Sequence, residues 1–192
     1  MLLLYRVLMF EPLNQALFAI AKPLGAFNYW IAKLARNGAG LLLVFMLCFI
    51  IAQVVFREFN NSLSWTEELS KFAMVWVACL VAPWAYRENL NVSIQMFADA
   101  LPMSLRRVTE FLINALVVFI AYRFLIESID FWQGGLSISA SSVPLSLAFF
   151  YSCIPFAFAA ILLVAIEKLL LQLSGRLPEQ LSPSVFPKQE ES

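Results

Sequence analysis

The sequence predicts an all-α integral membrane protein, with four transmembrane helices and N-terminal amphipathic helices that lie in the membrane interface. Hydrophobic residues make up 61% of the 192 residues and charged residues 14%, whereas a soluble domain has about 25% charged residues. Four long apolar runs carry few charges: 38–56, 69–86, 108–126 and 146–166. Each has 18 to 21 residues. At about 1.5 Å per residue, and with flanking residues, such a helix crosses a hydrocarbon core about 30 Å thick.

Residues 1–36 differ from these runs, because charged residues and two prolines interrupt their apolar stretches. Pro12 and Pro23 are expected to divide the segment into two short helices, since proline removes a helix hydrogen bond. Apolar residues share one face of each helix: Leu13, Ala16, Leu17 and Ile20 in the first, and Leu24, Phe27, Ile31 and Leu34 in the second. Such helices lie in the membrane interface. The alternative is a fifth span through Lys22 and Pro23.

The transmembrane domain is expected to comprise residues 37–172. Pro83 and Pro155 lie within its second and fourth runs, and each should kink its helix by removing a backbone donor. Residues 173–192 contain three prolines among polar residues. This composition predicts a flexible tail.

Lysine and arginine are unevenly distributed between the two sides of the predicted bundle. Ten lie in the N-terminal segment, the second connection and the tail. Two lie on the other side, Arg57 and Lys71 in the first connection. Because cytoplasmic loops are rich in these residues, both termini are predicted to be cytoplasmic.

The first connection has the polar pattern of a capped helix start. Ser64 and Glu67 fit a capping box, in which each side chain bonds a free backbone N–H. Trp65 has the position of an interfacial anchor, and Glu67 and Lys71 are four residues apart and able to pair. Two interpretations remain open. The connection is either a capped, anchored start of the second span, or a docking patch with ion-facing carboxylates.

Two further spans carry polar groups at helical spacing. Arg123 and Glu127 share a face of the third span, as Gln53 and Arg57 do at the end of the first. Arg123 either pairs with Glu127 at the outer surface or contacts a partner helix or lipid headgroup. Asn114 lies deeper in the third span and is expected to hydrogen-bond between helices.

Reactive chemistry is not predicted for this chain. It has no histidine, which removes the commonest metal ligand and general base. Its three cysteines lie in apolar runs and never form Cys-x-x-Cys, which is typical of packing residues. The formal net charge is zero, so no overall field attracts nucleic acid. The sequence therefore favours neither an enzyme nor a cofactor-binding protein.

An ordered set of motifs resembles the small membrane subunit, DctQ-type, of tripartite ATP-independent periplasmic (TRAP) transporters. The resemblance covers roughly residues 38–170. A tryptophan followed by paired glutamates is its most specific element. The residues that carry it are Arg57, Ser64-Trp65-Thr66-Glu67-Glu68, Trp76, Ala85-Tyr86-Arg87-Glu88, Asn91-Val92-Ser93-Ile94, Leu101-Pro102, Val143-Pro144, Tyr151 and Pro155.

The resemblance implies a role as a non-catalytic permease subunit in the bacterial inner membrane. In such systems a periplasmic binding protein delivers an organic acid to a large membrane subunit, which moves it with sodium. The small subunit scaffolds that partner, so sodium and substrate ligands are expected there and not in this chain. The alternative is a small membrane subunit of another solute transport system, such as a tricarboxylate transporter. The candidate contacts to a partner or to lipid are Arg57, Trp65, Glu67, Glu68, Arg87 and Arg123.

Overall fold

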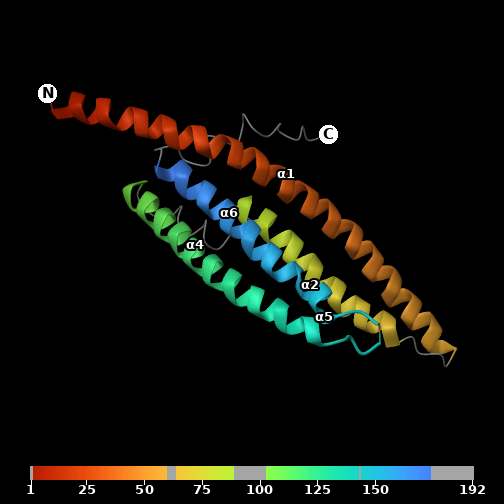
Figure 1. Ribbon diagram of the computed structural model, residues 1–192. Helices are drawn as coiled ribbons and strands as arrows, with labels where there is room; N and C mark the ends of the chain where they lie inside the picture. Colours follow the sequence, from red (N-terminus) through yellow and green to blue (C-terminus); the bar gives the residue numbers. More distant parts are fainter. Residues whose placement is uncertain (1, 60–63, 89–102, 143, 174–192) are drawn as a thin grey trace, which may run out of the picture.

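The computed structural model describes residues 2–59, 64–88, 103–142 and 144–173. The predicted tail and most of the second connection lie outside these residues. Within them the chain is built from helices, and Figure 1 shows the long ones side by side. The elements in order are α1 (Leu2–Glu58), α2 (Ser64–Arg87), α4 (Met103–Gly134), the 3₁₀ turn η1 (Gly135–Ser137), α5 (Leu147–Tyr151) and α6 (Cys153–Leu173).

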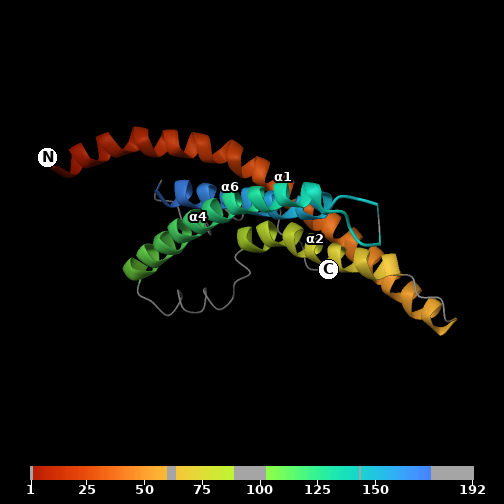
Figure 2. The ribbon, with the colours of Figure 1, turned by 60° about the horizontal axis from the view of Figure 1, so that its bottom comes forward.

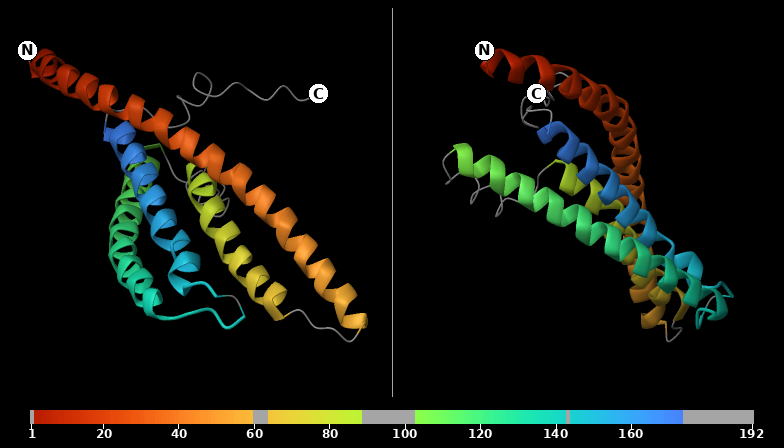
Figure 3. Two further views of the ribbon diagram at one scale, coloured as in Figure 1. Left: turned by 45° about the vertical axis from the view of Figure 1, so that its right-hand side comes forward. Right: turned by 60° about the vertical axis from the view of Figure 1, so that its left-hand side comes forward.

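Helix α6 lies in the middle of the bundle. It packs against α1, α2 and α4, whereas α1 packs against α2 and α6. Figure 3 shows that the bundle has two distinct ends. The α4–α5 connection and the C-terminal end of α1 lie at one, here called the loop end. The N-terminal half of α1 and the C-terminal end of α6 lie at the other, here called the arm end.

Four helical segments among the described residues are long and apolar enough to cross a membrane. They are Ala19–Glu58, Trp65–Arg87, Val108–Ser137 and Leu147–Leu173. Apart from Ser146, these segments include all four predicted runs. The predicted all-α architecture with four long apolar helices is therefore confirmed.

The expected pair of separate N-terminal helices is wrong, because residues 2–58 form one helix of 57 residues. Pro12 and Pro23 lie inside α1, which continues through them and curves (Figure 2). A proline removes a single hydrogen bond, and the bonds of the adjacent turns keep the helix continuous while it bends. At about 1.5 Å per residue, α1 is about 85 Å long. It is much longer than the hydrocarbon core, so much of its N-terminal part lies beyond the span.

Small residues form the face of α1 that packs on the bundle. The buried positions of this face alternate in spacing between four and three residues: Ala21, Gly25, Asn28, Ala32, Ala35 and Ala39. A repeat of 3.5 residues keeps one face in contact along a gently supercoiled helix. Short side chains also allow neighbouring backbones to approach closely. By contrast, the large side chains of Phe27 and Leu34 are 57% and 76% exposed, so this predicted apolar stripe faces outward.

The predicted kink at Pro155 takes the form of a break between two helices. Helix α5 ends at Tyr151 and α6 begins at Cys153, with Ser152 between them. Pro155 has no N–H to donate to the carbonyl of Tyr151, four residues earlier, and its ring crowds that carbonyl. In α2, Pro83 lies within a helix that continues to Arg87.

Candidate assembly site

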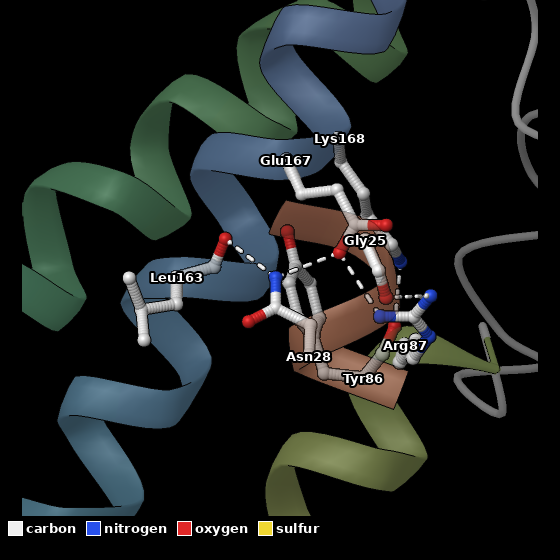
Figure 4. Close-up of polar contacts among 7 residues, drawn as sticks. All are labelled: Gly25, Asn28, Tyr86, Arg87, Leu163, Glu167 and Lys168. Carbon is white, nitrogen blue, oxygen red and sulfur yellow. Dashed lines mark hydrogen bonds and ion pairs between the residues drawn. The ribbon is translucent and has the colours of Figure 1, made fainter. Parts of the chain in front are cut away.

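A buried ion pair joins α2 to α6 at the arm end of the bundle. Arg87 Nη1 lies 3.0 Å from Glu167 Oε2, and the two side chains are 10% and 9% exposed. Arg87 Nη2 also donates a hydrogen bond to the carbonyl of Gly25 on α1, at 3.1 Å. Figure 4 shows Arg87 reaching from the end of α2 toward both helices. A single guanidinium therefore contacts α1 and α6 together.

Asn28 connects the same carboxylate to α1. Its side-chain amide donates to Glu167 Oε2 at 2.7 Å and to the carbonyl of Leu163 at 3.2 Å. One turn earlier on α1, Gly25 leaves room for the carboxylate. A Cβ at Gly25 would lie 2.7 Å from Glu167 Oε1. Glycine at this position thus permits the close approach of α1 and α6 (Figure 4).

The polar contacts continue from α6 through α2 to α4. Lys168 Nζ donates to the carbonyl of Tyr86 and lies 4.2 Å from the centroid of its ring. The Tyr86 hydroxyl donates to Asn114 Oδ1 on α4 at 2.8 Å, which confirms the predicted interhelical hydrogen bond. These contacts connect all four long helices and are here called the four-helix tie. Its residues are Gly25, Asn28, Tyr86, Arg87, Asn114, Glu167 and Lys168.

A second polar connection holds the chain between η1 and α5 at the loop end. The Glu68 carboxylate accepts backbone N–H bonds from Ser141 at 3.0 Å and from Ser142 at 2.7 Å. Ser139 and Ser146 form an antiparallel bridge within the same connection. The Glu68 carboxylate and the backbone amides of Ser141 and Ser142 are here called the loop tie. The loop tie attaches the connection to α2 near its N-terminal end.

The remaining predicted contact residues have more exposed positions. Trp65 is 42% exposed and makes an edge-to-face contact with Phe49 of α1. Glu67 pairs with Lys71 at 2.7 Å, which confirms the predicted i, i+4 pair. Arg57 is exposed in the last turn of α1.

The predicted pair in the third span is also present. Arg123 Nη2 lies 3.7 Å from Glu127 Oε1, and the two side chains are 60% and 65% exposed. The pair therefore lies on the outer surface of α4 and leaves Arg123 accessible to a lipid or to another chain.

The structure thus divides the six predicted contact residues into two groups. The described contacts of Arg87 and Glu68 lie within the chain: Arg87 connects three helices, and Glu68 connects α2 to the chain between η1 and α5. The other four side chains are exposed on the surface, at Arg57, Trp65, Glu67 and Arg123.

Besides Gly25, sequence reasoning missed three polar members of the four-helix tie, namely Asn28, Glu167 and Lys168. Each is polar and next to long apolar stretches, which is the one local signal that could have drawn attention to it. Asn28 and Glu167 are 139 positions apart. Their pairing depends on how α1 lies against α6, which no local pattern specifies.

The two ties are suited to holding parts of the bundle together. Among the described residues, no group of three or more histidine, cysteine, aspartate or glutamate side chains could hold a metal ion. The four-helix tie directs its charges at each other and at backbone carbonyls inside the bundle. Large apolar side chains cover much of the outer surface, including Leu41, Val44, Ile51, Leu112, Leu116 and Phe119.

Comparisons with known proteins agree on one family. The sequence profile of "Tripartite ATP-independent periplasmic transporters, DctQ component" matches residues 46–175. A relative from Haemophilus influenzae, assigned as a TRAP transporter small permease protein, is 31% identical over 116 residues, which are 59% of this chain and 72% of that protein.

Two longer relatives match through a small part of their length. The isethionate TRAP transporter permease protein DctMQ of Oleidesulfovibrio alaskensis is 25% identical over 58% of this chain and 17% of its own length. The sialic acid TRAP transporter permease protein SiaT of Haemophilus influenzae is 30% identical over 50% of this chain and 16% of its own length. The chain matches only about a sixth of these two permeases. From the profile match and the small-permease relative together, we conclude that this chain belongs to the DctQ component family and is a small subunit of a TRAP transporter.

Proposed function

We propose that this chain scaffolds a large membrane subunit during sodium-coupled uptake of an organic acid that a periplasmic binding protein delivers. The longer relatives support this most directly. In two permeases the region similar to this chain makes up 17% and 16% of the protein. The remainder of those permeases is covalently attached to it. We propose a large membrane subunit as the corresponding partner of this chain.

The arrangement of polar groups supports a scaffold over a carrier. A transport path needs facing polar groups at mid-depth in the membrane. In the described bundle the buried charges of Arg87, Glu167 and Lys168 lie at the arm end and bond to groups of neighbouring helices. They connect the helices into one unit. Alternating access needs one body to move against another, and such a unit is suited to be the stationary one.

The substrate class is proposed from the names of the relatives. One relative is named for isethionate and another for sialic acid, and both compounds are organic acids. Sodium and substrate are proposed to bind to the large subunit, as the family resemblance implies. Both termini are proposed to be cytoplasmic, on the basis of ten lysines and arginines on one side against two on the other.

Reconstitution into liposomes tests this proposal. Three preparations would be compared under a sodium gradient with a panel of organic acids: this chain alone, the large subunit with the binding protein, and all three together. We expect uptake only from the complete set. Uptake by this chain alone would contradict a scaffold role. Full uptake without this chain would show that the large subunit needs no scaffold.

A further inference from the structure

A group of cations and aromatic rings at the arm end takes no part in the four-helix tie. Lys33 follows Tyr29 by four residues and Trp30 by three, and Arg36 follows Lys33 by three, so the four residues lie on one face of α1. Lys33 Nζ lies 5.3 Å from the Trp30 ring centroid and 5.7 Å from that of Tyr29. The Arg36 guanidinium lies 5.3 Å from the Trp84 ring on α2. These five residues are here called the α1–α2 cation patch.

The cations of this patch have no carboxylate partner among the described residues. Four cations of α2 and α4 pair with a carboxylate, at Lys71, Arg87, Arg106 and Arg123. For Lys33 and Arg36, the described partners are aromatic rings alone. Between residues 19 and 57, α1 contains four lysines and arginines and no acidic residue. The patch is therefore complementary to an anion.

The position of the patch along α1 indicates where that anion lies. The uncharged run 38–56 starts two residues after Arg36. At about 1.5 Å per residue it spans about 28 Å, close to the thickness of a hydrocarbon core. Lys33 and Arg36 therefore lie about one turn beyond its edge, at the depth of phospholipid phosphates. Tryptophan and tyrosine prefer the same depth, and Trp30 is 65% exposed.

We propose that Lys33 and Arg36 bind the phosphate of an anionic phospholipid at the edge between α1 and α2. The rings of Trp30 and Trp84 lie against the glycerol region and the start of the acyl chains. A lipid is favoured over a protein carboxylate because phospholipid phosphates surround a helix at this depth. This site is independent of the proposed transport function and needs only the membrane placement of α1.

Native mass spectrometry of the full chain tests the site, with phosphatidylglycerol as the anionic probe and phosphatidylcholine as the uncharged comparison. We expect the wild-type chain to retain phosphatidylglycerol preferentially, and added salt to weaken its retention. The double variant Lys33→Gln/Arg36→Gln should bind it on the order of tenfold more weakly. The charge-conserving variant Lys33→Arg/Arg36→Lys should keep most of the binding. The single variants Lys33→Gln and Arg36→Gln provide the same comparison if the double variant does not fold.

Arg57→Gln is the matched control, because Arg57 is exposed at the other end of the same helix. It should leave phosphatidylglycerol retention unchanged. Equal losses for Arg57→Gln and the double variant would overturn the proposal, as would retention that added salt leaves unchanged. If the double variant keeps its lipid but no longer co-purifies with the large subunit, the cations bind a protein carboxylate and the lipid site is wrong.

Discussion

Arg87 and Glu167 form an ion pair at 3.0 Å that is almost completely enclosed by α1, α2 and α6. Removing two charges from water is costly, and good geometry with further hydrogen bonds offsets that cost. Both conditions hold here, because Gly25 and Asn28 supply bonds to the same two side chains. We therefore expect a large loss of stability chiefly when only one member of the pair is removed.

Replacing Glu167 with glutamine should destabilise the chain strongly. Arg87 would keep its charge in a buried site without its counter-ion, and breaking a buried pair in this way costs about 3–5 kcal/mol. The free energy of unfolding in mild detergent measures the effect. Glu127→Gln is the control, since it removes a carboxylate from an exposed pair and should cost about 0–1 kcal/mol. Equal effects of the two variants would contradict the role given to the buried pair.

Removing both charges should be less damaging than removing one. In Arg87→Leu/Glu167→Leu neither member of the ion pair is left without the other, and buried pairs replaced by apolar residues often lose little stability. We expect the double variant to be more stable than Glu167→Leu alone, measured in the same detergent. A double variant with the summed loss of the two single variants would show that the side chains do not interact energetically.

Two glycines of α1 should respond in opposite directions to alanine. Gly25→Ala places a Cβ 2.7 Å from Glu167 Oε1, so the carboxylate must shift, and overpacking of this kind costs about 1–3 kcal/mol. Gly38→Ala meets no atom within 4 Å and should stabilise the helix by up to about 1 kcal/mol through higher helix propensity. The thermal unfolding temperatures of both variants, compared with that of the wild-type chain, test this prediction. A loss of stability in Gly38→Ala would indicate a contact that the described bundle lacks.

Glu68→Gln should loosen the connection between η1 and α5. The carboxylate accepts two backbone N–H bonds, from Ser141 and Ser142, and bonds to an ionised acceptor are stronger than those to an amide. Hydrogen–deuterium exchange at these two amides should become faster. The neighbouring variant Glu67→Gln removes only the helical pair with Lys71 and should leave their exchange unchanged. Slow exchange in both variants would mean that Glu68 does not hold this connection.

A topology reporter should show both chain ends on the cytoplasmic side. Lysine and arginine favour that side ten to two, and this bias sets orientation in membrane proteins. A reporter fused after Gly175 should be active in the cytoplasm, and one inserted at Gly134, the end of α4, should be active in the periplasm. A periplasmic signal after Gly175 would overturn the orientation.

The sequence alone determined the features that depend on one helix at a time. Length and lack of charge were enough to find the four long helices, because the thickness of the hydrocarbon core sets the number of residues in a span. The pairs Glu67–Lys71 and Arg123–Glu127 could be found because residues four apart share a helical face. The tryptophan and paired glutamates that open α2 identified the family for a similar reason, since they are contiguous in the chain.

The tertiary structure decided how these helices are connected. Pro23 could end or bend a helix by local rules, and the structure shows that α1 continues through it. Arg87 and Glu167 are 80 positions apart, and neither residue carries a local sign of the other. Their contact depends on the small residues along the packed face of α1, on the residue at which α2 ends and on how far α6 extends along the bundle. An interhelical contact needs several helices to pack in one register, and side-chain volume sets that register across the whole bundle.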